Sequence, residues 1–196
     1  MSALLLDAIR HRYACREFAA DRSLATDETD ALLEAGRLAP SAFGLEPWRF
    51  VSVTDDAGRT RIAHACFDQP AATTAAAFIA IVARVAVLDP DSDYVRARFE
   101  AEARGGDIAS IYQAYRGMYD ADTIAAWAQG QCNFAAAHIL LQTAHLELGS
   151  CPIGGFDATT LGQALNLAAG EVPALVIALG RCLAPQPTRI RKPLTQ

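Results

Sequence analysis

The chain has 196 residues, enough for one domain over residues 1–196 and too few for two comfortable ones. Apolar residues make up 52 %, charged residues 20 %, and the formal net charge is −5. That charge argues against nucleic-acid binding, which needs a basic face. The N-terminal apolar run is too short for a signal peptide and no stretch predicts a membrane span, so we expect a cytoplasmic protein that binds no membrane.

The cysteines are odd in number and widely scattered. The five are Cys15, Cys66, Cys132, Cys151 and Cys182. No pair of cysteines or histidines has the spacing of metal ligands, and the pattern indicates no disulfide framework. We therefore expect no metal site, and free thiols in the reducing cytoplasm.

The first half of the chain predicts two helices, a strand and the start of a third helix. Apolar residues share one helical face over residues 4–9, and a second helix begins at Thr26, which we expect to be its N-cap. Pro40 ends that helix, and residues 40–47 form a loop. Residues 49–54 alternate as in a strand, and Asp55 and Asp56 follow as a helix start.

The second half predicts two buried strands and a long helix. Residues 78–86 are continuously apolar, as in a central strand, whereas residues 91–119 predict one or two surface helices. Residues 122–148 form a helix that is apolar nearly all round, which favours a central or interface position. A tight loop (151–156), a short helix (158–165) and a buried strand (173–181) follow, then a basic tail.

This order of elements predicts an α+β layer fold and not a doubly wound sheet, because strands and helices do not alternate regularly. No Gly-x-Gly-x-x-Gly follows the first strand, so a dinucleotide-binding Rossmann unit is unsupported. No hydrolytic triad is indicated either, because no histidine has a partner Gly-x-Ser-x-Gly motif.

Two pairs of arginines are candidates for binding a small anion. Arg12 and Arg16 are four residues apart, so on a helical turn both side chains reach the same point. Arg189 and Arg191 are two apart and share one side of an extended chain. Two such pairs suit a dianionic phosphate, which guanidinium groups grip bidentately. The alternative is an ordinary solvated charged face.

Two loops are candidates for contacting a ligand. A serine in the loop 40–48 could donate to a ligand oxygen, although a plain helix-to-strand connection is the alternative. Adjacent glycines at residues 154–155 would let the backbone approach a planar ligand, although taken alone they favour a simple tight turn.

Taken together, these segments resemble the nitroreductase family, especially its oxygen-insensitive nitroreductase and flavin reductase branch. The resemblance rests on six pieces in order, covering almost the whole chain. They are residues 12–18 (Arg-Tyr-Ala-Cys-Arg-Glu-Phe), 39–48 (Ala-Pro-Ser-Ala-Phe-Gly-Leu-Glu-Pro-Trp), 67–70 (Phe-Asp-Gln-Pro), 127–131 (Trp-Ala-Gln-Gly-Gln), 152–157 (Pro-Ile-Gly-Gly-Phe-Asp) and 189–191 (Arg-Ile-Arg).

The resemblance implies a nitroreductase-like fold, with a central, mostly antiparallel sheet flanked by helices, a long central helix and a C-terminal tail exchanged between the subunits of a homodimer. It implies an FMN-dependent NAD(P)H oxidoreductase that reduces a small-molecule acceptor (a nitroaromatic, quinone or flavin) by ping-pong hydride transfer. The flavin N5 would carry the hydride, so no protein acid or base is required. The alternative is an FMN-binding protein without efficient NAD(P)H turnover.

The resemblance also assigns site residues. It implies that Arg12, Arg189 and Arg191 bind the FMN phosphate and that Arg16 lies near the flavin pyrimidine. The loop at Pro40, Ser41 and Ala42 reaches the cofactor of the partner subunit, and residues 152–155 face N5. The full cofactor set is Arg12, Tyr13, Ala14, Arg16, Pro40, Ser41, Ala42, Gly44, Gln69, Gln131, Pro152, Ile153, Gly154, Gly155, Arg189 and Arg191. Substrate contacts would come from Phe43 and, in a helical excursion over residues 91–120 covering the site, from Tyr112 and Tyr115.

The chain departs from the family pattern at several positions. Ala14 stands where a serine is usual, and Gly44 and Glu46 replace a common asparagine and glutamine. Gly154 replaces a frequent glutamate, although a backbone contact would survive there. Beside the pyrimidine we prefer Gln69 to its acidic neighbour, because a negative charge would disfavour the anionic reduced flavin.

Overall fold

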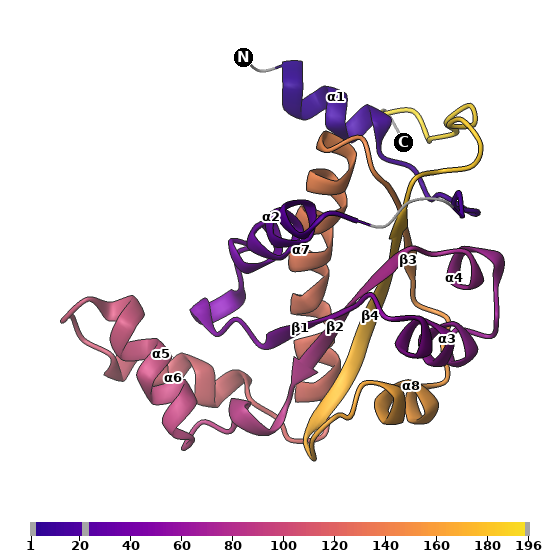
Figure 1. The fold of residues 1–196 in the computed structure, drawn as a ribbon. Coiled ribbons are helices and arrows are strands. Elements are labelled where there is room, and N and C mark those ends of the chain that lie inside the picture. The colour runs from indigo at the N-terminus through magenta and orange to yellow at the C-terminus, as the bar shows by residue number, and fades with distance from the viewer. Residues whose placement is uncertain (1–2, 21–23, 195–196) are drawn as a thin grey trace.

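The computed structural model describes residues 3–20 and 24–194 and is built on one antiparallel sheet (Figure 1). Its strand order is β1-β2-β4-β3, and every neighbouring pair is antiparallel. The strands are β1 (Trp48–Val53), β2 (Ala77–Arg84), β3 (Gly149–Ile153) and β4 (Glu171–Gly180). The predicted antiparallel sheet is therefore confirmed.

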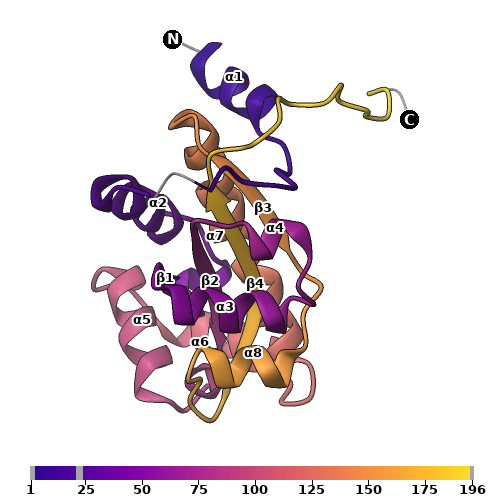
Figure 2. The ribbon, with the colours of Figure 1, turned by 45° about the vertical axis from the view of Figure 1, so that its right-hand side comes forward.

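Helices cover both faces of the sheet (Figures 1 and 2). The long helix α7 (Ile124–His145) packs with α2 (Thr26–Arg37) on one face, whereas α3 (Asp56–Ala65), α4 (Pro70–Thr73) and α8 (Ala158–Ala164) pack on the other. Along β2, Ile79 and Ile81 face α7, and Phe78 and Ala80 face the second layer. Burial on both faces explains why this strand is apolar up to its last residue, Arg84.

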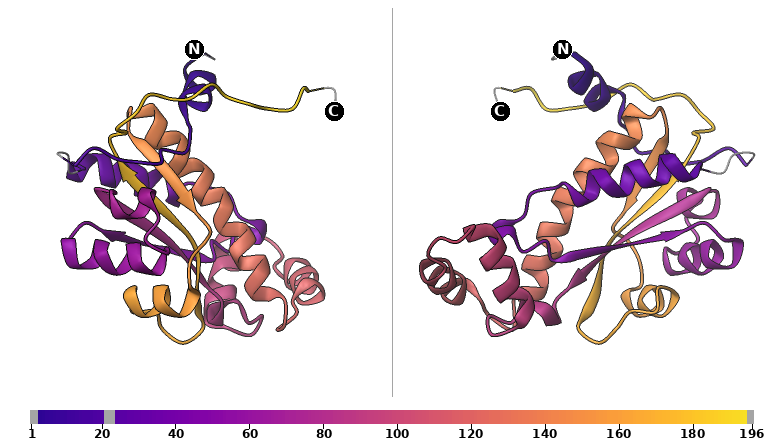
Figure 3. Two further views of the ribbon diagram at one scale, coloured as in Figure 1. Left: turned by 90° about the vertical axis from the view of Figure 1, so that its right-hand side faces the viewer. Right: turned by 60° about the vertical axis from the view of Figure 1, so that its left-hand side comes forward.

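The remaining helices lie at the ends of this core. Helix α1 (Ala3–His11) packs on α7, and the tail after β4 passes α1 and extends away from the sheet (Figure 3). Helices α5 (Asp93–Ala103) and α6 (Ala109–Met118) project at another end as the predicted excursion (Figure 1). Short 3₁₀ turns span Ala42–Gly44 and Ala86–Leu88. No helix in the described part of the chain has the length and apolar character needed to cross a membrane.

Three local predictions are wrong. The N-cap of α2 is Ala25 and not Thr26, because the Glu28 carboxylate accepts the Ala25 N–H at 2.9 Å. The expected tight loop at 151–156 begins as strand β3, whose residues pair with β4. Pro152 fits there because β3 is an edge strand and needs no donor on its open side. Finally, Arg12 and Arg16 share no helical turn, since α1 ends at His11.

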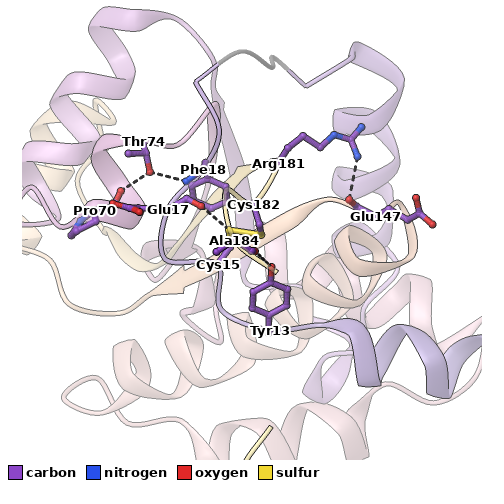
Figure 4. Close-up of a disulfide and its surroundings, with 10 residues drawn as sticks. All are labelled: Tyr13, Cys15, Glu17, Phe18, Pro70, Thr74, Glu147, Arg181, Cys182 and Ala184. Carbon is purple, nitrogen blue, oxygen red and sulfur yellow. Dashed lines mark hydrogen bonds between the residues drawn. A yellow bond between two sulfur atoms is a disulfide. The ribbon is translucent and has the colours of Figure 1, made fainter. Parts of the chain in front are cut away.

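The structure also corrects the prediction of unpaired cysteines, because Cys15 and Cys182 form a disulfide (Figure 4). Their Cα atoms are 5.8 Å apart, within the range that a disulfide spans. The flanking backbones are also joined, since Leu183 N–H donates to the Glu17 carbonyl at 3.0 Å. The sequence separation of 167 positions explains why no spacing revealed the pair.

Counting thiols tests this pairing directly. Because the structure leaves Cys66, Cys132 and Cys151 free, we expect a thiol reagent to titrate three thiols in the chain unfolded without reductant. After reduction the count should rise to the five cysteines of the sequence. Five reactive thiols before reduction would contradict the disulfide.

Candidate cofactor site

The segment after α1 runs along the edge strand β3. Cys15 N–H donates to the Ser150 carbonyl at 2.9 Å, and Ala14 forms a parallel bridge with Ser150. Arg16 places Nη1 3.9 Å from the Cys151 sulfur. The structure thereby brings the predicted residues 12–16 next to the predicted residues 152–155, although 135 positions of the sequence separate Arg16 from Cys151.

Three arginines gather at the end of α1. The Arg189 guanidinium donates to the Arg10 carbonyl at 2.8 Å and also contacts the Arg12 carbonyl. Both carbonyls lie at the C-terminal end of α1, where backbone acceptors lack intrahelical partners. A cation is therefore favoured there. Partial burial lowers the pKa of Arg12, and the positive charges of Arg189 and Arg191 lower it further.

Like charges are therefore held together here without compensation. Within residues 3–20 and 24–194, no carboxylate lies within 4.0 Å of the guanidinium groups of Arg12, Arg189 or Arg191. A cluster of this kind is suited to an anion, because a bound dianion would remove the mutual repulsion.

The two glycines after β3 have open space around them. A Cβ added at Gly155 would meet no atom within 4 Å, and one added at Gly154 would meet only Leu175 Cδ1 at 4.0 Å. Packing therefore does not require glycine at either position. Both residues are exposed, so their backbone is accessible to a planar ligand.

Gln69 lies in the same layer of the molecule. It is the N-cap residue of α4, whose Ala71 and Ala72 are buried in the same apolar cluster as Cys15 and Ile153. Its side-chain Nε2 donates to the Cys66 carbonyl at 3.1 Å. The neighbouring Asp68 turns to the exposed His64, at 3.3 Å.

A second group of predicted residues lies across the sheet. Ala42 N–H donates to Gln131 Oε1 of α7 at 2.9 Å, and the Ser41 hydroxyl accepts from Glu46 N–H at 2.8 Å. The Phe43 ring packs against Tyr115 at 5.3 Å between centroids. This loop contacts the apolar cluster on the α7 face, whereas Ala14, Cys15 and Ile153 belong to the opposite face. One chain thus presents its predicted cofactor residues as two separate groups.

Two predicted site residues use their hydroxyl groups in contacts within the chain. Tyr115 is fully buried and donates its hydroxyl proton to the Leu88 carbonyl at 2.6 Å, and its burial raises the pKa of the phenol. It packs in the core of the excursion, whereas Tyr112 is only half-buried. Tyr13 uses its hydroxyl to hold the Ala184 carbonyl of the tail, at 2.9 Å (Figure 4).

Sequence reasoning missed the residues of α5 that hold the loop before β1. Arg98 Nη2 lies 2.8 Å from the Glu46 carboxylate, and Tyr94 donates its hydroxyl proton to the Leu45 carbonyl at 2.7 Å. Their spacing of four residues, which places both on one helical face, was the available signal.

An antiparallel sheet between two helical layers, with an uncompensated arginine cluster at its edge, defines an α+β protein suited to an anionic ligand. The chain belongs to the nitroreductase family, whose profile matches residues 9–181. It is therefore a nitroreductase-like oxidoreductase.

Individual relatives agree with this assignment. An oxygen-insensitive NADPH nitroreductase of Helicobacter acinonychis is 28 % identical over 190 residues, which cover 94 % of this chain and 90 % of that protein. The solved structure of a nitroreductase-like protein from Streptococcus mutans superposes with a TM-score of 0.85 at 21 % identity, covering 100 % of this chain and 96 % of that one. A structure from Exiguobacterium sibiricum, solved in complex with FMN, gives a TM-score of 0.81 at 20 % identity, with 97 % and 94 % covered.

Proposed function

We propose that the chain binds FMN as a homodimer and uses NAD(P)H to reduce a small acceptor such as a nitroaromatic, a quinone or a second flavin. The observation that carries the proposal is the uncompensated cluster of Arg12, Arg189 and Arg191, and the open backbone at glycines 154–155 supports it. The phosphate of FMN supplies the missing negative charge, and the flat ring system suits the open backbone.

The separation of the predicted residues into two groups supports the homodimer. Ser41 and Ala42 lie on the α7 face, whereas Ala14 and Ile153 lie on the other, so a ligand that touches both groups needs two copies of the chain. Large apolar side chains are also exposed on α1 and α7. They are Leu5 (62 %), Leu6 (46 %), Ile9 (41 %) and Phe134 (50 %). Such surfaces are typical of subunit interfaces.

When bound, FMN would supply the redox chemistry, taking a hydride from NAD(P)H and passing the electrons on to the acceptor. The residues of this chain would bind and orient the cofactor and the acceptor. Arg12, Arg189 and Arg191 would hold the phosphate, and a backbone N–H after β3 would donate to the ring edge. The half-buried Phe43 and Tyr112 supply apolar surface for an acceptor, with little hydrogen-bonding readout, which favours loose specificity.

The visible spectrum of the purified protein tests the proposal. We expect a yellow protein whose flavin absorbance bleaches when NADPH or NADH is added without oxygen, and recovers when a quinone follows. A yellow protein that does not bleach would contradict the reductase and leave an FMN-binding protein. A colourless protein that takes up no added FMN would contradict both.

A further inference from the structure

The loop before β1 lies beside helix α5 (Figure 1). Arg98 donates from Nε to the Gly44 carbonyl at 2.7 Å and from Nη2 to the Glu46 carboxylate at 2.8 Å. Tyr94 donates its hydroxyl proton to the Leu45 carbonyl at 2.7 Å. One guanidinium therefore grips the loop through both its backbone and a side chain, which is the strong form of such contacts.

The backbone of this loop needs such support. Phe43 has φ 59° and Glu46 has φ 41°, which is the left-handed region that residues with a side chain avoid. Gly44 has φ 62°, and a Cβ there would lie 2.6 Å from the Glu102 carboxylate of α5. A strained backbone persists only where its surroundings hold it, and α5 supplies those surroundings.

The hold on Glu46 extends to the residues predicted to reach the cofactor. Glu46 N–H donates to the Ser41 hydroxyl at 2.8 Å. Ala42, which follows Ser41, donates its N–H to Gln131 Oε1 of α7 at 2.9 Å. The loop is thus held between α5 and α7. Two of its positions that depart from the family pattern, Gly44 and Glu46, are the ones that Arg98 contacts.

We propose that Arg98 is a positioning residue, which holds residues 41–46 in the conformation that completes the flavin and acceptor site. This inference rests on the proposed function. Arg98 touches neither cofactor nor acceptor. It acts by neutralising Glu46 and by holding the Gly44 carbonyl. The same guanidinium lies 3.7 Å from the Glu102 carboxylate of its own helix.

Hydrogen exchange of the cofactor-free protein tests the hold by itself. In Arg98→Ala we expect the amides of residues 41–46 to exchange about tenfold faster, because one charge-assisted contact of about 1.4 kcal/mol is worth that factor. Arg96→Ala is the matched control. Arg96 lies on the same helix and its guanidinium pairs with the exposed Asp93 at 3.5 Å, so residues 41–46 of this variant should exchange as in the wild type.

Steady-state kinetics test the positioning. We expect Arg98→Ala to raise the KM for a quinone acceptor about tenfold with kcat at saturating FMN changed less than about twofold, because flavin chemistry does not involve the guanidinium. A merely structural role would reduce the amount of folded protein and would leave KM unchanged. Arg98→Lys, which keeps the charge and loses the two-point grip, should be intermediate.

Two outcomes would overturn the proposal: unchanged exchange in Arg98→Ala, or faster exchange with an unchanged KM. If Arg98→Ala does not fold, Glu46→Gln removes the same ion pair at nearly constant shape and takes its place in both measurements. If the wild type neither binds FMN nor oxidises NADPH, the proposed function fails. The hydrogen-exchange result then stands by itself: faster exchange in Arg98→Ala supports the hold of Arg98 on the loop, and unchanged exchange refutes it.

Discussion

Replacing Arg12 with alanine is expected to weaken FMN binding by about 10- to 100-fold, the equivalent of about 1.5–3 kcal/mol for contacts between charged groups. Riboflavin, which lacks the phosphate, should bind the variant and the wild type with similar affinity. The reason is that Arg12 stands in a cluster with Arg189 and Arg191 whose charge no described carboxylate neutralises. Fluorescence titration with both flavins measures the two affinities.

The cofactor-free protein provides an independent check of this prediction. Because burial and two neighbouring charges lower the pKa of Arg12, the folded state disfavours its charged form, and the alanine variant should lose little stability. Arg10→Ala is the matched control, since Arg10 is exposed and pairs with Asp7 at 3.2 Å. An equal loss of FMN and riboflavin affinity in Arg12→Ala would show that Arg12 does not bind the phosphate.

Replacing Tyr115 with alanine is expected to lower the free energy of unfolding by about 3–5 kcal/mol, as for other buried aromatic residues. The ring is fully buried and packs edge-on against Phe43 at 5.3 Å and Phe99 at 5.6 Å. Tyr115→Phe keeps these contacts and removes only the hydrogen bond to the Leu88 carbonyl, so it should cost about 1 kcal/mol. Urea unfolding of the three proteins measures both losses.

The Tyr115→Phe variant also tests whether Tyr115 contacts a substrate. A buried tyrosine cannot donate to an acceptor, so Tyr115→Phe should keep the acceptor KM of the wild type. Tyr112→Phe serves as the comparison, because Tyr112 is half-buried on the same helix. A large rise of KM in Tyr115→Phe with unchanged stability would instead support the prediction that Tyr115 contacts the substrate.

Strong local patterns in the sequence predicted most of the elements. The strands β2 and β4 lie close to their expected positions, because buried strands leave a run of apolar residues. The long helix α7 does too, because its sequence is long, rich in apolar residues and free of proline. The pattern failed at β3, where Pro152 and the following glycines suggested a turn. An edge strand pairs on one side only, so it tolerates residues that a central strand excludes.

The candidate site divides in the same way. The sequence by itself determined the family, through six ordered pieces, and the residue types that can hold an anion. The predicted geometry of Arg12 and Arg16 on one helical turn was wrong, because α1 ends before them. Their arrangement comes instead from the pairing of residues 14–15 with Ser150 and from the tail that returns past α1.

Only the tertiary structure decided which residues meet across long stretches of chain. The Cys15–Cys182 disulfide, the burial of Tyr115 and the grip of Arg98 on Glu46 each join segments whose separation leaves no local trace. The tertiary structure also decided that the predicted cofactor residues lie on two opposite faces of the sheet. Local sequence encodes burial and turn preferences, whereas contacts between distant segments depend on how the whole sheet and its helical layers pack.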